Sequence, residues 1–359
     1  MLLGIGFKVI LLSAVLLGLL IPLRSRLLAT DGPATSGAGR YSRHPVLSML
    51  QPLAQLLDAL SFDARTEGYS ARRVAKVATA AVFVAPLSAF AVLPFGSRYD
   101  FGEGSVSLVV ADLPWGIVWL IGATLISIYG STTLIVDADK RAQHAIVSIS
   151  YTSGAALALV ALAMNFQTLN PLEIAVAQDG TFFVGSFMGP ALPMLQSLQL
   201  PNWGILLQPV SLALFCVCTL AIPSAHVATR GQQIEARVDG AGQFWLRTSE
   251  HLGVMLVASV VVALFGGAGA IPYLDAATIV DAIAVYYGTG LATILCMVLH
   301  MSVFFGKVLL VALLLEPLRR RLLELGFASS LSLCWRWVVP VCMANLWVTG
   351  AWIVEGWFS

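Results

Sequence analysis

The stretch YGTGLATILCMVLHMSVFFGKVLLVALLLEPLRRR, at residues 287–321, decides the fold. Lys307 is its single charged side chain before Glu316, and three arginines follow at 319–321. Crossing about 30 Å of hydrocarbon takes roughly 20 apolar residues in a helix. The stretch therefore predicts a transmembrane helix over 287–316, long enough to tilt or to continue into the arginine cluster.

Similar apolar stretches occur along the whole sequence. Hydrophobic residues make up 58% of the chain and charged residues only 11%, whereas about 25% charged is usual in soluble domains. We therefore predict an all-α membrane protein, a single polytopic domain over 1–359 with eight transmembrane helices. The predicted spans are 3–22, 75–95, 113–136, 143–164, 203–222, 252–273, 287–316 and 333–354. The first is too long for a typical signal peptide and is expected to be retained.

Basic residues are distributed unevenly between these spans. Sixteen of the 20 Lys and Arg residues lie in the first, third, fifth and seventh gaps, counting Lys76 at the edge of the second span with the first gap, and the other gaps hold only Arg98. Basic loops stay on the cytoplasmic side, or on the matrix side in a mitochondrion. Both termini are then expected on the periplasmic or intermembrane side of an energy-transducing membrane, bacterial or mitochondrial.

The long first gap contains an amphipathic segment at 46–60. Ser48, Gln51 and Asp58 lie largely opposite an apolar helical face formed by Val46, Leu50, Leu53, Leu56, Leu57 and Leu60. We expect a surface helix after the first span, which either lies in the membrane interface or caps a cavity between spans.

Few residues suggest a cofactor. All five cysteines fall inside predicted spans, and the pair Cys296 and His300 has helical spacing but supplies only two metal ligands. These side chains are expected to pack, with no metal bound. No phosphate loop, dinucleotide motif or iron–sulfur cysteine cluster is present in the sequence. A redox centre must therefore belong to a partner.

Several short motifs resemble a known family. CWRWVVP at 334–340 and NLWVTGAW at 345–352 resemble the last helix of the H subunit of respiratory complex I, the NADH-quinone oxidoreductase (the mitochondrial ND-one type). Other elements of that family occur in the same order: LQPLA at 50–54, PFG at 94–96, SIYG at 127–130, FGG at 265–267 and FFGKV at 304–308.

The resemblance implies eight spans with a surface helix after the first. It also implies a membrane subunit that anchors the peripheral redox arm and lines the cavity where ubiquinone or menaquinone is reduced. Expected partners are the other membrane subunits of complex I, the quinone-proximal iron–sulfur subunits and lipids, with no nucleic acid. Quinone would be a substrate, and no cofactor would be covalently bound.

The expected site residues fall into two groups, and none of them is assigned as catalytic. The quinone headgroup is expected near Arg43, Gln51, Asp58 and Arg237. A proton path is expected to use Asp112, Tyr151, Glu250 and Lys307.

The chain departs from the family at residues that matter for proton movement. The acidic loop that follows the fifth span in the family is replaced by IPSAHVATRG at 222–231, and Thr152 stands where Glu usually follows Tyr151. Threonine does not titrate. We therefore expect a divergent member with altered proton coupling, its route changed, supplied by partners or lost.

Two alternatives remain open from the sequence. The segment PSAH at 223–226 resembles an element of the related subunit in membrane-bound hydrogenases, which use another electron donor. A stand-alone secondary transporter would show inverted repeats, and the two halves of this chain have no convincing similarity. Whether the chain itself counts as an enzyme stays undecided, because the expected subunit carries no redox centre.

Overall fold

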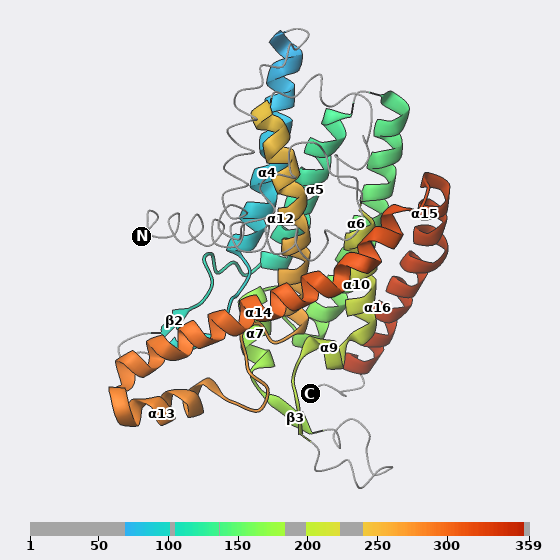
Figure 1. Cartoon of the computed structure of the whole chain (residues 1–359). Helices are drawn as coiled ribbons and strands as arrows, with labels where there is room; N and C mark the ends of the chain where they lie inside the picture. Colours follow the sequence, from blue (N-terminus) through green and yellow to red (C-terminus); the bar gives the residue numbers. More distant parts are fainter. Residues whose placement is uncertain (1–68, 101–104, 136, 184–198, 223–239, 355–359) are drawn as a thin grey trace. The chain divides into compact units, whose positions relative to one another are not determined.

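The computed structural model describes residues 69–100, 105–135, 137–183, 199–222 and 240–354 (Figure 1). Within these ranges, six helical segments are long and apolar enough to cross a membrane. They are α4 (Tyr69–Ala91), α5 (Gly116–Leu134), α6 (Ala138–Phe166), α12 (Gly240–Phe265), α14 (Thr289–Leu323) and the continuous segment Phe327–Val354. The prediction of an all-α membrane protein is confirmed. The predicted first span and the segment 46–60 lie outside the described residues.

The chain forms two compact units. The first contains Met1–Phe90, Ala123–Ser148 and Pro223–Val254, and the second contains Ala91–Gly122, Ile149–Ile222 and Met255–Ser359. In the first unit, Gly130 on α5 packs against α4, because a Cβ at this position would lie 2.8 Å from the Ala78 carbonyl oxygen. Small residues allow this close approach of helices in membranes. A core of Ala75, Ala78, Val82, Leu134 and Leu246 surrounds the contact.

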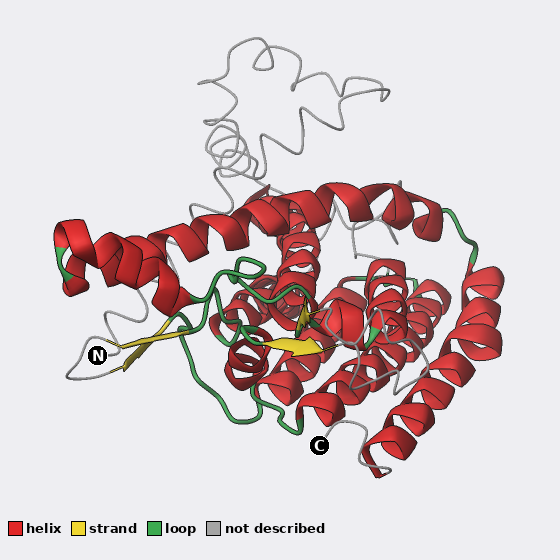
Figure 2. Cartoon of the chain, turned by 90° about the horizontal axis from the view of Figure 1, so that it is seen from below, coloured by secondary structure: helices red, strands yellow, loops and turns green. Residues whose placement is uncertain are grey.

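The second unit combines helices with two short antiparallel hairpins (Figure 2). Its shorter helices are α7 (Pro171–Gln178), α9 (Gly204–Leu207), α10 (Pro209–Ala221) and α13 (Ala276–Tyr287). Strand β1 (Arg98–Asp100) pairs with β2 (Ser105–Ser107), and β3 (Thr181–Phe183) pairs with β4 (Gln199–Pro201). The hairpins connect helices and form no larger sheet within the described residues.

Helix α14 is the longest element of this unit. Its buried residues recur mostly every four positions: Ala292, Thr293, Cys296, His300, Phe304, Val308, Ala312 and Glu316. Because a helix turns about 100° per residue, each step of four advances the buried face by about 40°. The buried stripe therefore winds around α14, and the helix contacts α13, β1 and α10. Figure 1 shows its oblique course.

Three predicted spans have different limits in the structure. The sixth, predicted to 273, has its helix end at Phe265, where two glycines follow and Gly267 has a φ of 69°. The fifth is divided at Gln208, whose backbone leaves the helical region before Pro209 begins α10. The seventh continues through the arginine cluster to Leu323, because Arg, Leu and Glu are strong helix formers.

The last span changes its hydrogen-bond pattern along its length. Helix α15 (Phe327–Leu333) is followed by a π-helical turn, η4 (Cys334–Val338), and then by α16 (Val339–Val354). The Val339 N–H donates to the Cys334 carbonyl, five residues back. Pro340 has no N–H to give to the carbonyl four residues before it, and its ring crowds that carbonyl. The wider turn relieves this conflict, as π-bulges do inside other α-helices.

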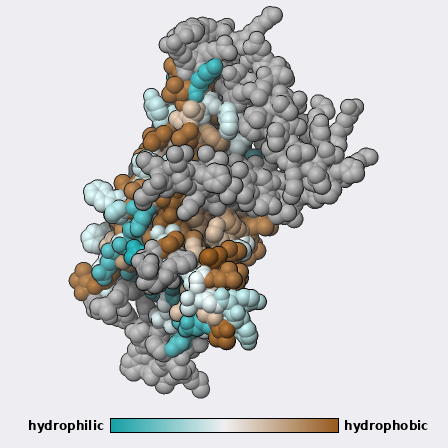
Figure 3. Space-filling model, turned by 90° about the vertical axis from the view of Figure 1, so that its left-hand side faces the viewer, coloured by the Kyte–Doolittle hydropathy of each residue, from teal (hydrophilic) through white to brown (hydrophobic). Residues whose placement is uncertain are grey.

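Large apolar side chains reach the surface throughout the described chain (Figure 3). Trp335, Trp337 and Trp347 are each at least 60% exposed on η4 and α16. A soluble monomer rarely leaves apolar area of this extent in water. Lipid or other membrane subunits are therefore the expected surroundings of these helices.

Candidate functional site

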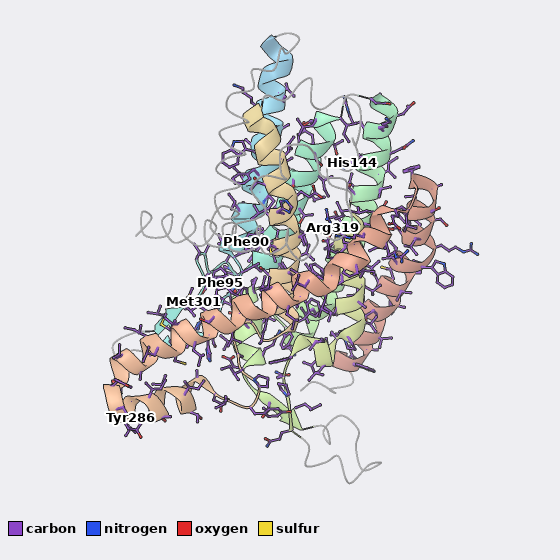
Figure 4. The ribbon with its side chains drawn as sticks, viewed as in Figure 1. Phe90, Phe95, His144, Tyr286, Met301 and Arg319 are labelled. Carbon is purple, nitrogen blue, oxygen red and sulfur yellow. The ribbon has the colours of Figure 1, made fainter. Side chains whose placement is uncertain are left out.

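A cluster of polar side chains lies beside α14 in the second unit. Figure 4 places Phe95 and Met301 along the middle of this helix and Arg319 near its far end. Phe95 packs edge-on against Phe304, with ring centroids 5.2 Å apart, and so brings the segment before β1 to the helix. The polar groups of this cluster are Tyr99 and His300, which are hydrogen-bonded to each other, and Asp179 and Lys307, which interact through charge.

Lys307 binds the turn that follows α12. Its ammonium donates to the carbonyl oxygens of Gly266 at 2.8 Å, Ala268 at 3.1 Å and Ala270 at 2.7 Å. The nitrogen also lies 4.4 Å from the ring centroid of Trp203. The last carbonyls of a helix have no intrahelical partner and carry a partial negative charge. A lysine with three donors matches this arrangement.

Helix α7 also binds this turn, through the side chain of Gln178. The Gln178 side chain donates to the Leu264 carbonyl and accepts from the Gly267 N–H at 2.7 Å. Gln178 is almost fully buried, so both bonds replace water that the amide would otherwise bind. The turn between α12 and α13 is therefore fixed by Gln178 and Lys307 together.

His300 lies two turns before Lys307 on α14 and is 2% exposed. Its Nδ1 is hydrogen-bonded to the Tyr99 hydroxyl from β1. Its Nε2 is buried and has no hydrogen-bonding partner among the described residues. A buried polar atom in this state costs about 1–3 kcal/mol. The imidazole therefore retains an unused donor or acceptor in the interior of the unit.

Asp179 follows α7 and is coupled to this cluster through charge and through Ser97. Burial raises the pKa of the Asp179 carboxyl, and a hydrogen bond with the Ser97 side chain and the charge of Lys307 partly offset that rise. Burial likewise raises the pKa of the Tyr99 hydroxyl, whereas its bond with the Ser97 backbone lowers it. Burial therefore makes both groups harder to ionise than they are in water.

The predicted proton-path residues have separate surroundings. Asp112 is exposed, accepts from Asn170 Nδ2 at 2.7 Å and lies 3.8 Å from an Arg98 nitrogen. Tyr151 is fully buried and donates to the Ser330 carbonyl at 3.0 Å. Glu250 is half-buried on α12 in the first unit. Their role in proton movement stays a prediction, because these contacts are compatible with packing alone.

The predicted quinone residues Arg43, Gln51, Asp58 and Arg237 lie outside the described residues. The structure adds residues that sequence reasoning missed. Asp179, Gln178 and Trp203 carry no sequence motif, and they join the cluster through contacts between distant segments. Cys296 and His300 are both buried on α14. Within the described ranges, no group of three or more metal-ligating side chains occurs.

Comparison with known proteins agrees with the motifs. No model of a protein family matches the chain. The H subunit (form 2) of the NADH-quinone oxidoreductase of Syntrophobacter fumaroxidans is 24% identical over 322 residues, which cover 85% of this chain and 83% of that protein. The H subunit of the same enzyme in Syntrophotalea carbinolica is 24% identical over 323 residues, with the same coverage. Its counterpart in Bdellovibrio bacteriovorus is 26% identical over 288 residues, or 73% of each chain. The resemblance drawn from the motifs is confirmed.

Proposed function

We propose that this chain, a homologue of the H subunit of NADH-quinone oxidoreductase, is the corresponding membrane subunit of a respiratory complex I. The observation that carries the proposal is the similarity to several such subunits over most of both lengths. The apolar helices of the structure support a multi-pass location in an energy-transducing membrane. In this role the chain anchors the peripheral arm and lines the quinone cavity.

Basic side chains at helix ends support the docking role. Lys140 and Arg141 are exposed at the start of α6, and Arg319–Arg321 lie in the last turns of α14. The Glu316 carboxylate accepts from Arg320 Nε at 3.3 Å and lies 3.8 Å from Arg319 Nη1. These positive groups would face the peripheral arm on the cytoplasmic or matrix side. Both termini would then lie on the periplasmic or intermembrane side.

The partners and substrate follow from the same proposal. Electrons would reach ubiquinone or menaquinone through the quinone-proximal iron–sulfur subunits, and other membrane subunits would cover the apolar faces. Arg43, Gln51, Asp58 and Arg237 are the residues that we assign to the quinone headgroup. Guanidinium and amide groups can donate hydrogen bonds to a quinone carbonyl, and that donation strengthens as the oxygen gains charge.

Proton coupling is proposed to differ from that of the relatives. Thr152 is buried beside Tyr151 on α6 and has no titratable group. Asp112, Tyr151, Glu250 and Lys307 are assigned to the remaining route. The three carbonyl bonds to Lys307 would hold its ammonium in place unless they are broken. We therefore propose that Lys307 acts on the route as a fixed positive charge and does not itself carry the proton.

The experiment is purification of the chain, tagged at one end, from its native membrane in a mild detergent. Co-purification with iron–sulfur subunits is expected, together with NADH-quinone reductase activity that a quinone-site inhibitor abolishes. Hydrogen evolution without quinone reduction would instead identify a hydrogenase assembly. A monomer that transports a solute in liposomes would overturn the proposal in favour of a transporter.

A further inference from the structure

The polar cluster beside α14 contains one group that the proposed proton route does not use. His300 is enclosed on α14, a helix long and apolar enough to cross the membrane, and ionisable side chains within such helices are rare and usually functional. Imidazole is also the side chain whose ordinary pKa, about 6.5, allows it to gain and lose a proton near neutral pH. His300 is therefore a candidate for a functional group within α14.

Only one of the two ring nitrogens of His300 has a hydrogen-bonding partner among the described residues. The Tyr99 hydroxyl bonds to Nδ1 and fixes the orientation of the imidazole. Gly96 leaves room for this contact, because a Cβ there would lie 3.0 Å from the Tyr99 oxygen. The other ring nitrogen, Nε2, is buried with no partner among the described residues. An apolar side chain at this position would leave no unpaired nitrogen and would avoid that cost, which is about 1–3 kcal/mol.

A neighbouring charge would favour release of a proton bound to the ring. The Lys307 ammonium repels a positive charge on His300. Asp179 follows α7 and interacts with Lys307, Tyr99, Cys296 and Asp275. An imidazolium formed here would be opposed by the Lys307 ammonium, which favours release of the proton. Among the described residues, no carboxylate forms an ion pair with the ring.

We propose that His300 is a proton-transfer residue, held by Tyr99, that takes up and releases one proton at Nε2 during quinone reduction. The neutral ring binds a proton at its free nitrogen and becomes an imidazolium, and loss of that proton restores the starting form. The step needs no oxidant or second reactant. It rests on the proposed function, in which quinone chemistry drives proton movement, and it supplies a titratable group to a chain that has Thr152 in place of a carboxylate.

The test uses sealed inverted vesicles that contain the assembled complex. His300→Gln keeps a polar group but cannot hold an extra proton, and Tyr99→Phe removes only the hydroxyl. Each variant is compared with wild type for complex content, for NADH-quinone reductase turnover and for proton uptake per electron pair from pH 5.5 to 8, a range of about one to two units around the ordinary histidine pKa. Ser302→Ala is the matched control, because Ser302 is exposed on α14 and its hydroxyl donates to the Val298 carbonyl of its own helix.

His300→Gln is expected to lower the rate of proton uptake roughly tenfold or more, the low end of what a positioned acid–base group contributes. Tyr99→Phe is expected to shift the pH at which uptake is half-maximal, with complex content unchanged. Wild-type uptake and pH dependence in both variants would overturn the proposal. If His300→Gln fails to assemble, Tyr99→Phe decides alone. Absence of quinone reductase activity from the wild-type assembly would refute the proposed function instead, before any variant is compared.

Discussion

Lys307 shows how a single charged residue can be stable inside an apolar helix. Placing a lysine at the centre of a transmembrane helix costs about 2.5–3.5 kcal/mol on insertion scales. Each hydrogen bond that involves a charged group contributes about 1.5–3 kcal/mol, and Lys307 makes three of them with the turn after α12. The bonds therefore offset the cost, and the turn gains a fixed shape in return.

Gly267 is the residue on which that shape depends most directly. Its φ of 69° is unfavourable for side chains other than glycine, and a Cβ would overlap the Trp203 indole. Gly267→Ala is therefore expected to destabilise the protein by about 1–3 kcal/mol. The melting temperature of the purified assembly would measure the loss. Gly306→Ala is the control, because its Cβ meets open space on α14 and the change should stabilise by up to about 1 kcal/mol. Equal melting temperatures for Gly267→Ala and wild type would contradict this account of the turn.

Contacts between helices determine how the elements of the second unit fit together. Gly154 on α6 faces two thiols, since a Cβ there would lie 2.6 Å from Cys218 Sγ and 3.8 Å from Cys342 Sγ. Nearby, α10 and α16 are joined by polar bonds: Gln208 Nε2 donates to Thr349 Oγ1 at 2.9 Å, and Asn345 Nδ2 donates to Ser211 Oγ at 2.7 Å. Small residues and interhelical hydrogen bonds are the usual determinants of helix association in membranes.

The bond between Ser211 and Asn345 can be tested by a double-mutant cycle. Ser211→Ala, Asn345→Ala and the double variant are expected to show a coupling free energy of about 0.6 kcal/mol, the average for such bonds in membranes, and at most about 1.7 kcal/mol. Unfolding in mixed detergent micelles supplies the free energies. The pair Ser302→Ala and Asn345→Ala serves as reference, since Ser302 bonds within its own helix. Strict additivity for Ser211 and Asn345 would mean that the bond contributes nothing.

The sequence predicted the positions of the apolar helices well and their exact limits less well. It did not predict the polar cluster beside α14. The apolar stretches identified the helices because hydrocarbon thickness fixes how many residues a span needs. The hydrophobic pattern did not show that α12 ends before Gly266 and Gly267, or that the chain leaves the helix at Gln208. The bond between Tyr99 and His300 joins residues 201 positions apart, and Asp179 follows a short helix without a motif. Such meetings depend on tertiary packing, which periodicity and composition do not encode.

For the whole molecule, the alternation of basic gaps predicts which loops share a side of the membrane. Lys140 and Arg321 belong to gaps rich in basic residues, whereas Tyr286 precedes α14 in a gap that lacks them. All three side chains are exposed, and the five native cysteines are buried. The chain is therefore suited to cysteine labelling without removal of its own thiols.

Lys140→Cys and Arg321→Cys are expected to react with a membrane-impermeant maleimide from the cytoplasmic or matrix side. Tyr286→Cys is expected to react from the opposite side, because basic loops resist translocation and the intervening helices reverse direction. Labelling of right-side-out and inverted vesicles measures this directly, with wild type as the control for native thiols. Reaction of all three cysteines from one side would refute the predicted topology.

Because α14 is long, a small change in its tilt would move its ends by several ångströms. Its 35 residues rise about 52 Å at 1.5 Å per residue, well beyond the roughly 30 Å of hydrocarbon. His300 and Arg319 are separated by about 28 Å along this helix, and Pro317 lies between them. A tilt of roughly 5° about one end displaces the other by about 4–5 Å. A change at the buried histidine that tilts α14 would therefore move the arginine cluster, with no need for a series of side-chain rearrangements between the two sites.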